Sequence, residues 1–246
     1  MARSRETKIE LTAYDDLFQT DESREEAKLS KIRDIPISEI DEFPDHPFKV
    51  LMDEDMEQLV ESIKERGVIT PATVRQKEDG RYELVSGHRR KRACELAGFE
   101  TLRSEIVDLN RDEATILMVE SNFQRSEILP SEKAFAYKMR LEAMKRQGFR
   151  SDLTSAPVGQ KFSVEQIADN STDSKTQIQR YVRLTNLVPE LLEFVDEGRI
   201  KMRPAVELSY LDEDSQRDVV DEIDMNDATP VSYTHLRAHE TELHLV

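Results

Sequence analysis

The spacing of the apolar residues divides the chain into a first part with both strands and helices and a second part that is helical. In the first part, Met56, Leu59 and Ile63 recur at helical spacing behind an acidic start and before Gly67, which predicts a capped helix. Alternating apolar residues on either side of a Glu-Asp-Gly turn predict a β-hairpin. The elements expected in this part are a strand at 35–40, a helix from 53 to 67, strands at 72–76, 81–85 and 102–109, and helices at 88–97, 112–122 and 131–147.

The second part contains short helices joined by polar turns. Residues 148–160 are rich in Ser, Thr, Pro and Gly and predict an exposed connection. A short capped helix, a polar turn and a second helix over 174–184 match a helix-turn-helix at about 163–184. Further helices are expected at 189–197 and from 203 onward. The expected fold class is therefore an α+β N-terminal domain followed by an all-α helix-turn-helix domain.

Composition and charge narrow the function classes. The 246 residues include 35 Lys and Arg against 51 Asp and Glu, so the formal charge is −16. This surplus of acid argues against a DNA binder that acts by overall charge, but a recognition helix acts locally, because charges are screened over ~8–10 Å at cellular salt. Cys94 is the single cysteine, which excludes a disulfide framework and a cysteine-rich zinc module. No apolar run reaches the ~18–20 residues of a membrane span and no secretory signal is seen, so we expect a cytoplasmic protein without a membrane partner.

The strongest chemical signal is the segment Ser86-Gly-His-Arg-Arg-Lys-Arg-Ala93, which follows a predicted strand and opens a predicted helix. The first N–H groups of a helix have no partner within it and carry partial positive charge. Gly87 lets an anion approach the backbone because it has no Cβ, and arginine forks suit phosphate oxygens. The alternative is a solvated basic face on a surface helix. The polyphosphate ligands expected here are Ser86, Gly87, His88, Arg89, Arg90 and Arg92.

A second segment, Gly67-Val-Ile-Thr-Pro71, is expected to close over this site. It leaves a helix and enters a strand, so Gly67, Thr70 and Pro71 offer free backbone groups and a hydroxyl.

A third segment, Glu120-Ser-Asn-Phe-Gln-Arg125, ends a helix with a carboxylate, an amide and a guanidinium. Glu120 and Asn122 are oxygen donors of the kind that Mg²⁺ takes beside phosphates, and Arg125 is a further candidate ligand of the nucleotide. The alternative is an ordinary polar helix end.

These three segments, in this order, resemble the motifs of the ParB partition-protein family. The Leu-Pro-Ser-Glu sequence at 129–132 and the helix-turn-helix match as well, so the resemblance spans roughly 35–211. It implies an N-terminal domain of ParB/sulfiredoxin-like fold that binds CTP, with Asn122 among its ligands, and closes into a DNA clamp. It also implies loading at a parS-like centromere site on double-stranded DNA, a homodimer, a ParA-type ATPase as partner, and segregation of a plasmid or chromosome.

The chain departs from the family pattern at several positions. Family members commonly carry Glu where His88 stands, and a Glu-Asn pair where this chain has Ser121-Asn122. If CTP hydrolysis serves as the clamp switch, Glu120 and Asn122 are the catalytic candidates, although one residue on a helix is about 100° of rotation. A Gln-Pro-Arg segment of the family is replaced by the segment 46–48, His-Pro-Phe, which removes a cation.

The start of the second helix of the helix-turn-helix is expected to enter the major groove. Gln can pair with adenine and Arg with guanine, whereas Ser and Thr more often hold phosphate. The alternative is a plain helical hairpin whose polar face meets water. The DNA contacts expected are Ser174, Lys175, Thr176, Gln177, Gln179, Arg180 and Arg183.

Three other functions compete with partition. A transcriptional or nucleoid-associated regulator of the same fold would bind DNA without hydrolysing nucleotide. A ParB-like nuclease is disfavoured because no cluster of metal-binding carboxylates is seen. Sulfiredoxins share the fold of the nucleotide domain, but their reactive cysteine stands where this chain has Gly87, and Cys94 is expected to be a buried thiol inside the next helix.

The expected organisation ends in a tail of different composition. His235 and His239 are spaced as a metal-binding pair would be, but no acidic ligand context supports a site, and the tail is expected to be disordered and non-native. The domains expected are a flexible arm at 1–34, a CTP-binding domain at 35–127, a helical DNA-binding domain at 128–224 and the tail at 225–246.

Overall fold

The computed structural model describes residues 31–125, 127–151, 164–165, 167–169 and 171–226. Most of the expected arm, most of the expected connection before the helix-turn-helix, and the tail after residue 226, with its histidine pair, lie outside the described residues. The described part has a mixed sheet with helices, followed by a helical part, which confirms the expected fold class. No helix of the described part is long and apolar enough to cross a membrane.

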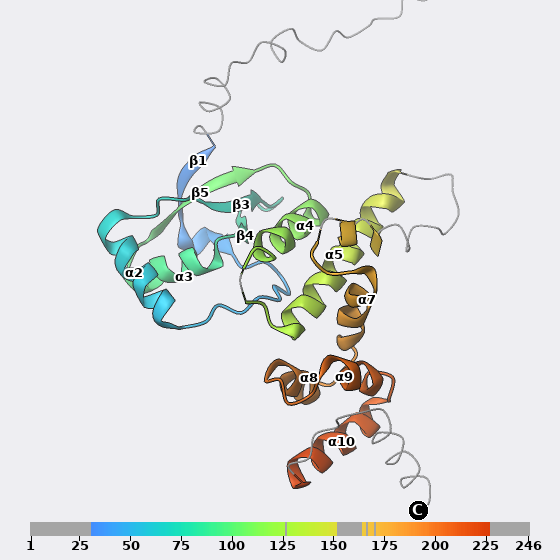
Figure 1. Ribbon diagram of the computed structural model, residues 1–246. Coiled ribbons are helices and arrows are strands. Elements are labelled where there is room, and N and C mark those ends of the chain that lie inside the picture. Colours follow the sequence, from blue (N-terminus) through green and yellow to red (C-terminus); the bar gives the residue numbers. More distant parts are fainter. Residues whose placement is uncertain (1–30, 126, 152–163, 166, 170, 227–246) are drawn as a thin grey trace, which may run out of the picture.

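The first part is built on a five-stranded sheet in the order β1-β5-β3-β4-β2 (Figure 1). The outer pairing of β1 with β5 and the central pairing of β3 with β4 are antiparallel, whereas β5 with β3 and β4 with β2 are parallel. The β3–β4 hairpin predicted from the sequence is confirmed. The strands are β1 (Ile32–Pro36), β2 (Ile40–Asp41), β3 (Ala72–Gln76), β4 (Tyr82–Ser86) and β5 (Thr101–Val107).

The strand expected at 35–40 is instead two strands on opposite edges of the sheet. β1 begins at Ile32, inside the segment expected as a flexible arm, because it pairs along β5 with Ile35 opposite Leu102. A 3-10 turn, η2 (Ile37–Glu39), follows, and the Ile37 N–H donates to the carbonyl oxygen of Glu100 at 2.9 Å. The turn carries the chain across the sheet to β2, beside β4.

Helices cover both faces of this sheet. Leu84 and Val85 are neighbours in β4 and fully buried, but they belong to different hydrophobic clusters, because successive strand residues point to opposite faces. Leu84 packs with α2 (Glu54–Arg66) and α3 (His88–Ala97), and Val85 with α4 (Arg111–Asn122). Both α2 and α3 end at the glycines that the sequence predicts.

Helix α5 (Pro130–Ser151) joins the sheet domain to the helical part. It runs four residues past its expected end, into the segment expected as a connection. Three of its buried residues belong to three different hydrophobic clusters: Ala134 to that of the last helices, Ala136 to that of α4, and Tyr137 to that of the helix-turn-helix. One helix therefore contributes to every hydrophobic cluster outside the α2–α3 face.

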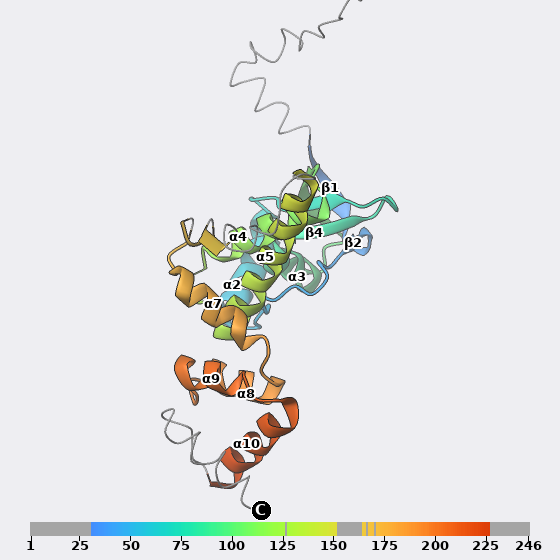
Figure 2. The ribbon, with the colours of Figure 1, turned by 90° about the vertical axis from the view of Figure 1, so that its right-hand side faces the viewer.

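The helical part continues away from the sheet, as the two views in Figures 1 and 2 show. Its last helix was not expected from the sequence, although Asp212 precedes it as a cap whose carboxylate accepts the Ser215 N–H at 2.9 Å. Ile223 of that helix is 2% exposed and packs in the cluster of the last helices. The helices are α7 (Lys175–Leu184), α8 (Pro189–Asp196), α9 (Met202–Leu208) and α10 (Glu213–Asn226).

The Cys94 side chain is fully buried in the cluster beneath α3. Burial, and to a lesser degree the charge of Glu95, raises the pKa of its thiol. The burial confirms the expectation of a buried thiol inside α3.

Candidate functional site

The start of α3 is held tightly against the sheet by Gly87. This residue has φ +105°, in the region that side chains other than glycine rarely adopt. A Cβ placed on it would lie 2.9 Å from the Cβ of Ala72 in β3. The glycine thus allows a close approach to β3, in addition to the approach of an anion expected from the sequence.

Replacing Gly87 by alanine is expected to lower the free energy of unfolding by about 3 kcal/mol, because the new Cβ adds a clash to the backbone strain. Gly98 caps the other end of α3 with φ +80° and open space around its Cβ position, so Gly98→Ala carries only strain and is expected to cost about 1 kcal/mol. Urea unfolding of both variants tests this. Equal losses would show that the contact with Ala72 is unimportant.

Arg90 ties the second predicted segment to the start of α3. Its Nη1 donates to the carbonyl oxygen of Thr70 at 2.7 Å and to that of Pro71. Burial lowers the pKa of this guanidinium. The structure therefore brings the segment 67–71 to α3, as expected. The Arg90 guanidinium, however, binds backbone carbonyl oxygens there, and was expected to bind phosphate.

The other cations of the motif have different surroundings. Arg89 is partly exposed, and its Nη2 lies 3.3 Å from Oδ1 of Asp53, the residue that caps α2. Arg92 is exposed and pairs with Glu95 at 2.9 Å on its own helix. Lys91 is buried, where it donates to Glu42 at 2.5 Å and to the Ile40 carbonyl at 3.1 Å. Arg89 is thus the cation of α3 best placed to take a new anion.

His88, the first residue of α3, stacks on His46, with ring centroids 3.7 Å apart and 34° between the planes. The Nε2 atoms of both rings are buried and have no hydrogen-bond partner, although a Glu42 carboxylate oxygen lies 3.8 Å from that of His88. Burial is the main cause that lowers the pKa of both, and it brings that of His88 to about 3. Both imidazoles are therefore neutral at pH 7.

Sequence reasoning missed His46 as a site residue. It and His88 are the two histidines that precede the tail, and the structure stacks one on the other. The small number of histidines before the tail could have indicated that His46 and His88 act together.

The third predicted segment also reaches this corner. Phe123 lies edge-on to Phe48 with ring centroids 6.3 Å apart, and Phe48 lies 5.6 Å from the His46 ring. The charge of Arg125 contributes to the lowered pKa of both His46 and His88. At the end of α4, the Asn122 side-chain amide donates to the Met118 carbonyl at 2.8 Å. The structure thus brings the end of the third segment to the start of α3, as expected.

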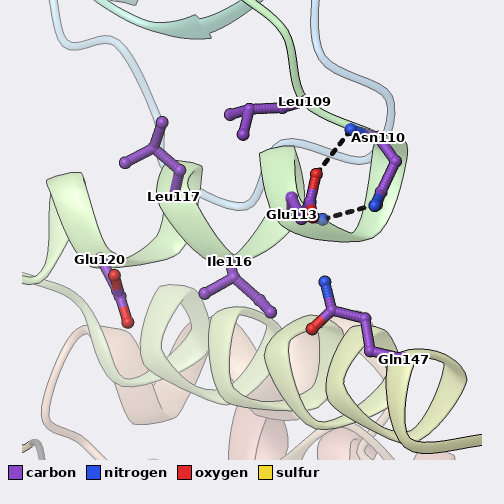
Figure 3. A pocket seen from close by; sticks show the side chains of 7 residues that line it. All are labelled: Leu109, Asn110, Glu113, Ile116, Leu117, Glu120 and Gln147. Carbon is purple, nitrogen blue, oxygen red and sulfur yellow. Dashed lines mark hydrogen bonds between the residues drawn. The ribbon is translucent and has the colours of Figure 1, made fainter. Parts of the chain in front are cut away.

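Glu120 has another partner. Its carboxylate accepts from Nη2 of the buried Arg140 at 2.5 Å. It lines a groove of about 510 Å³ between α4 and α5, where Figure 3 shows it with Glu113 and Gln147. The described residues contain no group of three or more His, Cys, Asp or Glu side chains that could hold a metal ion. The carboxylate of Glu120 is already paired with Arg140, so in this structure it differs from the free magnesium ligand expected from the sequence.

The second predicted site, the helix-turn-helix, is fixed to α5 by a polar cluster. Asp173, in the turn, accepts from the Tyr137 hydroxyl at 2.7 Å and pairs with Lys133 at 3.3 Å. Burial and the hydrogen bond to Asp173 raise the pKa of Tyr137. The hydroxyl of Ser174 caps α7 by accepting the Gln177 N–H at 3.3 Å. This cluster sets the direction in which α7 leaves the turn.

The residues expected to contact DNA divide into two groups. Thr176 and Gln179 are exposed and Arg180 is partly exposed, while Ile178 between them is fully buried. Arg183 instead donates to the Ser209 hydroxyl and carbonyl and stacks on the Tyr210 ring at 3.9 Å. Gln177 is partly exposed and belongs with the first group. Lys175 pairs with Glu165 across the turn and belongs with Arg183 in the second group. The outer face of α7 is therefore polar and available, whereas Arg183 joins α7 to the end of α9.

Comparisons with known proteins agree with this two-part arrangement. Residues 21–123 match the family model of the ParB N-terminal domain, and residues 158–239 match that of the ParB HTH domain. The chromosome-partitioning protein Spo0J of Thermus thermophilus is 32% identical over 166 residues, which are 68% of this chain and 55% of that protein. The nucleoid occlusion protein of Geobacillus sp. (strain WCH70) is 30% identical over 206 residues, 83% of this chain and 68% of that protein.

A solved structure is similar as well. The crystal structure of C-terminally truncated ParB from Caulobacter crescentus complexed with CTP-γ-S is 26% identical, with a TM-score of 0.36, over 78% of this chain and 98% of that one. This chain spans between about half and two thirds of the length of the curated relatives that it matches.

Proposed function

This chain belongs to the ParB family, and from that premise we propose that it is a sequence-specific DNA-binding partition protein whose sheet domain binds CTP and closes as a clamp on DNA. The proposed units are the CTP-binding domain at 35–127 and the DNA-binding domain at 128–224. A parS-like site, a homodimer and a ParA-type ATPase as partner are parts of the same proposal and come from the family.

The observation that carries the nucleotide proposal is the convergence of three segments at the start of α3. Arg89 is partly exposed there, Arg125 lies near His88, and Arg90 holds the segment 67–71 in place. The first N–H groups of the helix add partial positive charge. A corner with two available guanidinium groups and a helix start suits a triphosphate.

Each residue then has a role of its own. Arg89 and Arg125 would hold phosphate oxygens, the Thr70 hydroxyl would donate to the nucleotide, and Arg90 is a positioning residue. Bound CTP would supply the negative charge that holds the Ser121–Arg125 segment beside α3. The preference for a cytosine base is taken from the family, one member of which has been crystallised with CTP-γ-S. The proposal assigns no step to Mg²⁺.

For DNA, we propose that the outer face of α7 reads the major groove. Gln179 and Arg180 would contact base edges, and Thr176 would hold phosphate. Because Arg183 is held by Ser209 and Tyr210, its role would be to keep α9 beside α7.

A nucleotide titration tests the proposal. CTP, ATP, GTP and UTP are titrated into the protein by calorimetry, with and without a DNA duplex selected by the protein from a random library. We expect binding of CTP in preference to the other three, and a change in its affinity when the selected duplex is present. Equal affinity for all four nucleotides, or none for any, would contradict the CTP proposal.

A second candidate is a transcriptional or nucleoid-associated regulator that binds nucleotide without hydrolysing it. The observation in its favour is that Glu120 forms an ion pair with Arg140. Glu120 is the carboxylate next to Ser121, the position where the family commonly has Glu. Phosphate release measured with CTP and selected DNA separates the two: release that is accelerated by DNA supports a switching clamp, and none supports the regulator.

A further inference from the structure

A second groove lies between α5 and α7, on the side of the helix-turn-helix that carries the expected DNA contacts. Its volume is about 440 Å³, and we call it the lysine groove. Lysines from both helices form its rims, and apolar residues lie between them. The residues that define it are Lys138, Leu141 and Lys145 of α5, and Lys175, Gln179 and Val182 of α7.

Helical spacing explains why these residues share one groove. Lys138, Leu141 and Lys145 are three and four positions apart, so they follow one face of α5. Lys175 and Gln179 are four positions apart and follow one face of α7. Leu141 is 8% exposed and packs with Ile178 in the core beneath α7, so the two rims cannot separate without opening that core.

The cations on different faces of α5 differ in whether they form ion pairs. Lys133, Arg140 and Arg146 each have a carboxylate partner in the protein, namely Asp173, Glu120 and Asp112. Within the described part of the chain, neither Lys138 nor Lys145 has an ion pair. Among the cations of α5 whose side chains the structure describes, those without an ion pair are therefore the two that line the lysine groove.

Acidic residues reduce this charge without removing it. Glu142 also lines the groove, and Glu165 pairs with Lys175. Three lysines against these two carboxylates leave 3 − 2 = +1, in a chain whose total is −16. A local positive surface within a strongly acidic protein favours an anionic partner that docks at this place.

We propose that the lysine groove seats the phosphate backbone of the DNA whose bases α7 reads, so that α5 is part of the DNA interface. The inference rests on the proposed DNA binding. Gln179 belongs both to the groove and to the reading face of α7, so a duplex placed against that face passes beside Lys138 and Lys145. A lysine is a compact point charge on a flexible stem, which suits contact with a phosphate rather than with a base edge.

The test is the salt dependence of DNA binding by the double variant Lys138→Ala/Lys145→Ala. Each lost phosphate contact should lower the slope of log K against log salt by about 0.9, so we expect a decrease of about 1.8. Affinity should fall by the same factor for the selected duplex and for a scrambled one, which leaves the specificity ratio unchanged. The Lys→Gln pair, which keeps the side-chain stems, should give the same slope.

Two controls separate this inference from the function on which it rests. Lys31→Ala/Lys64→Ala makes the same charge change on exposed residues of the sheet domain and should leave the slope unchanged. Gln179→Ala should lower the specificity ratio instead of the slope. An unchanged slope in the groove variant, with the Gln179 effect intact, overturns the lysine groove but leaves DNA reading by α7. Absence of DNA binding by the unmodified protein overturns both.

Discussion

Replacing Arg89 by alanine is expected to weaken CTP binding at least a hundredfold while sequence-specific DNA binding stays nearly intact. Arg89 keeps 34% of its side chain exposed, and its one ion pair in the described part, with Asp53, is long at 3.3 Å. Its guanidinium is therefore available for phosphate oxygens, and loss of a charged partner from such a contact costs about 3 kcal/mol. Calorimetric titration of CTP and a DNA-binding assay measure the two effects.

Arg92→Ala is the matched control for this variant. Arg92 belongs to the same helix and motif, but it is exposed and bound to Glu95, so its loss should change CTP affinity by less than threefold, about 0.6 kcal/mol. Equal losses in the two variants would mean that the general charge of α3, rather than Arg89 itself, attracts the nucleotide. Equal loss of CTP and DNA binding in Arg89→Ala would contradict two separate sites.

Acidification from pH 7 to pH 5 is expected to lower the free energy of unfolding by about 2 kcal/mol. Burial, followed by the charges of His46, Lys91, Arg125 and Arg90, lowers the pKa of His88 from 6.5 to about 3. Below 6.5 the unfolded chain binds a proton that the folded protein excludes, so stability falls with pH and continues to fall until about pH 3. At 1.36 kcal/mol per pH unit, the interval from 6.5 to 5 gives about 2 kcal/mol, and His46 acts in the same direction.

Three carboxylates with lowered pKa values act mainly outside this pH range. The pKa of Asp41 is lowered by Arg81 and Lys77, and those of Asp79 and Asp212 are lowered as well. The stability that depends on these three groups is therefore lost mainly below about pH 5, as the unfolded carboxyls bind protons. Urea midpoints measured between pH 7 and pH 5 should therefore show a steep loss in the unmodified protein and a shallower one in His88→Gln. Parallel curves for the two proteins would show that His88 does not carry the effect.

The elements that local chemistry determines could be predicted from the sequence. Helix α3 was expected at 88–97 and is found there, because Gly87 and Gly98 both have positive φ and mark its two ends. The β3–β4 hairpin and the start of α2 at Asp53 follow likewise from turn and cap residues within a few positions. The glycine at the start of α3, on which the nucleotide proposal depends, was identified for the same reason.

Features that depend on distant partners could not be predicted. The split of the expected strand at 35–40 follows from pairing with β5 and β4, which are far along the chain. Glu120 was expected to be a metal ligand, but its partner is Arg140, twenty positions later on another helix. Arg90 likewise binds carbonyls on the preceding loop. Periodicity predicts that such charged residues lie near a helix end. It does not predict which partner from another part of the chain will contact them.

Because Ala134, Ala136 and Tyr137 anchor α5 in three hydrophobic clusters, the two units of this chain are expected to melt in one cooperative transition. Loosening either unit would strip apolar neighbours from the same helix and destabilise the other. If the protein closes as a clamp, the bending would therefore occur beyond the ends of α5, and α5 would move as one rigid body with the units packed against it.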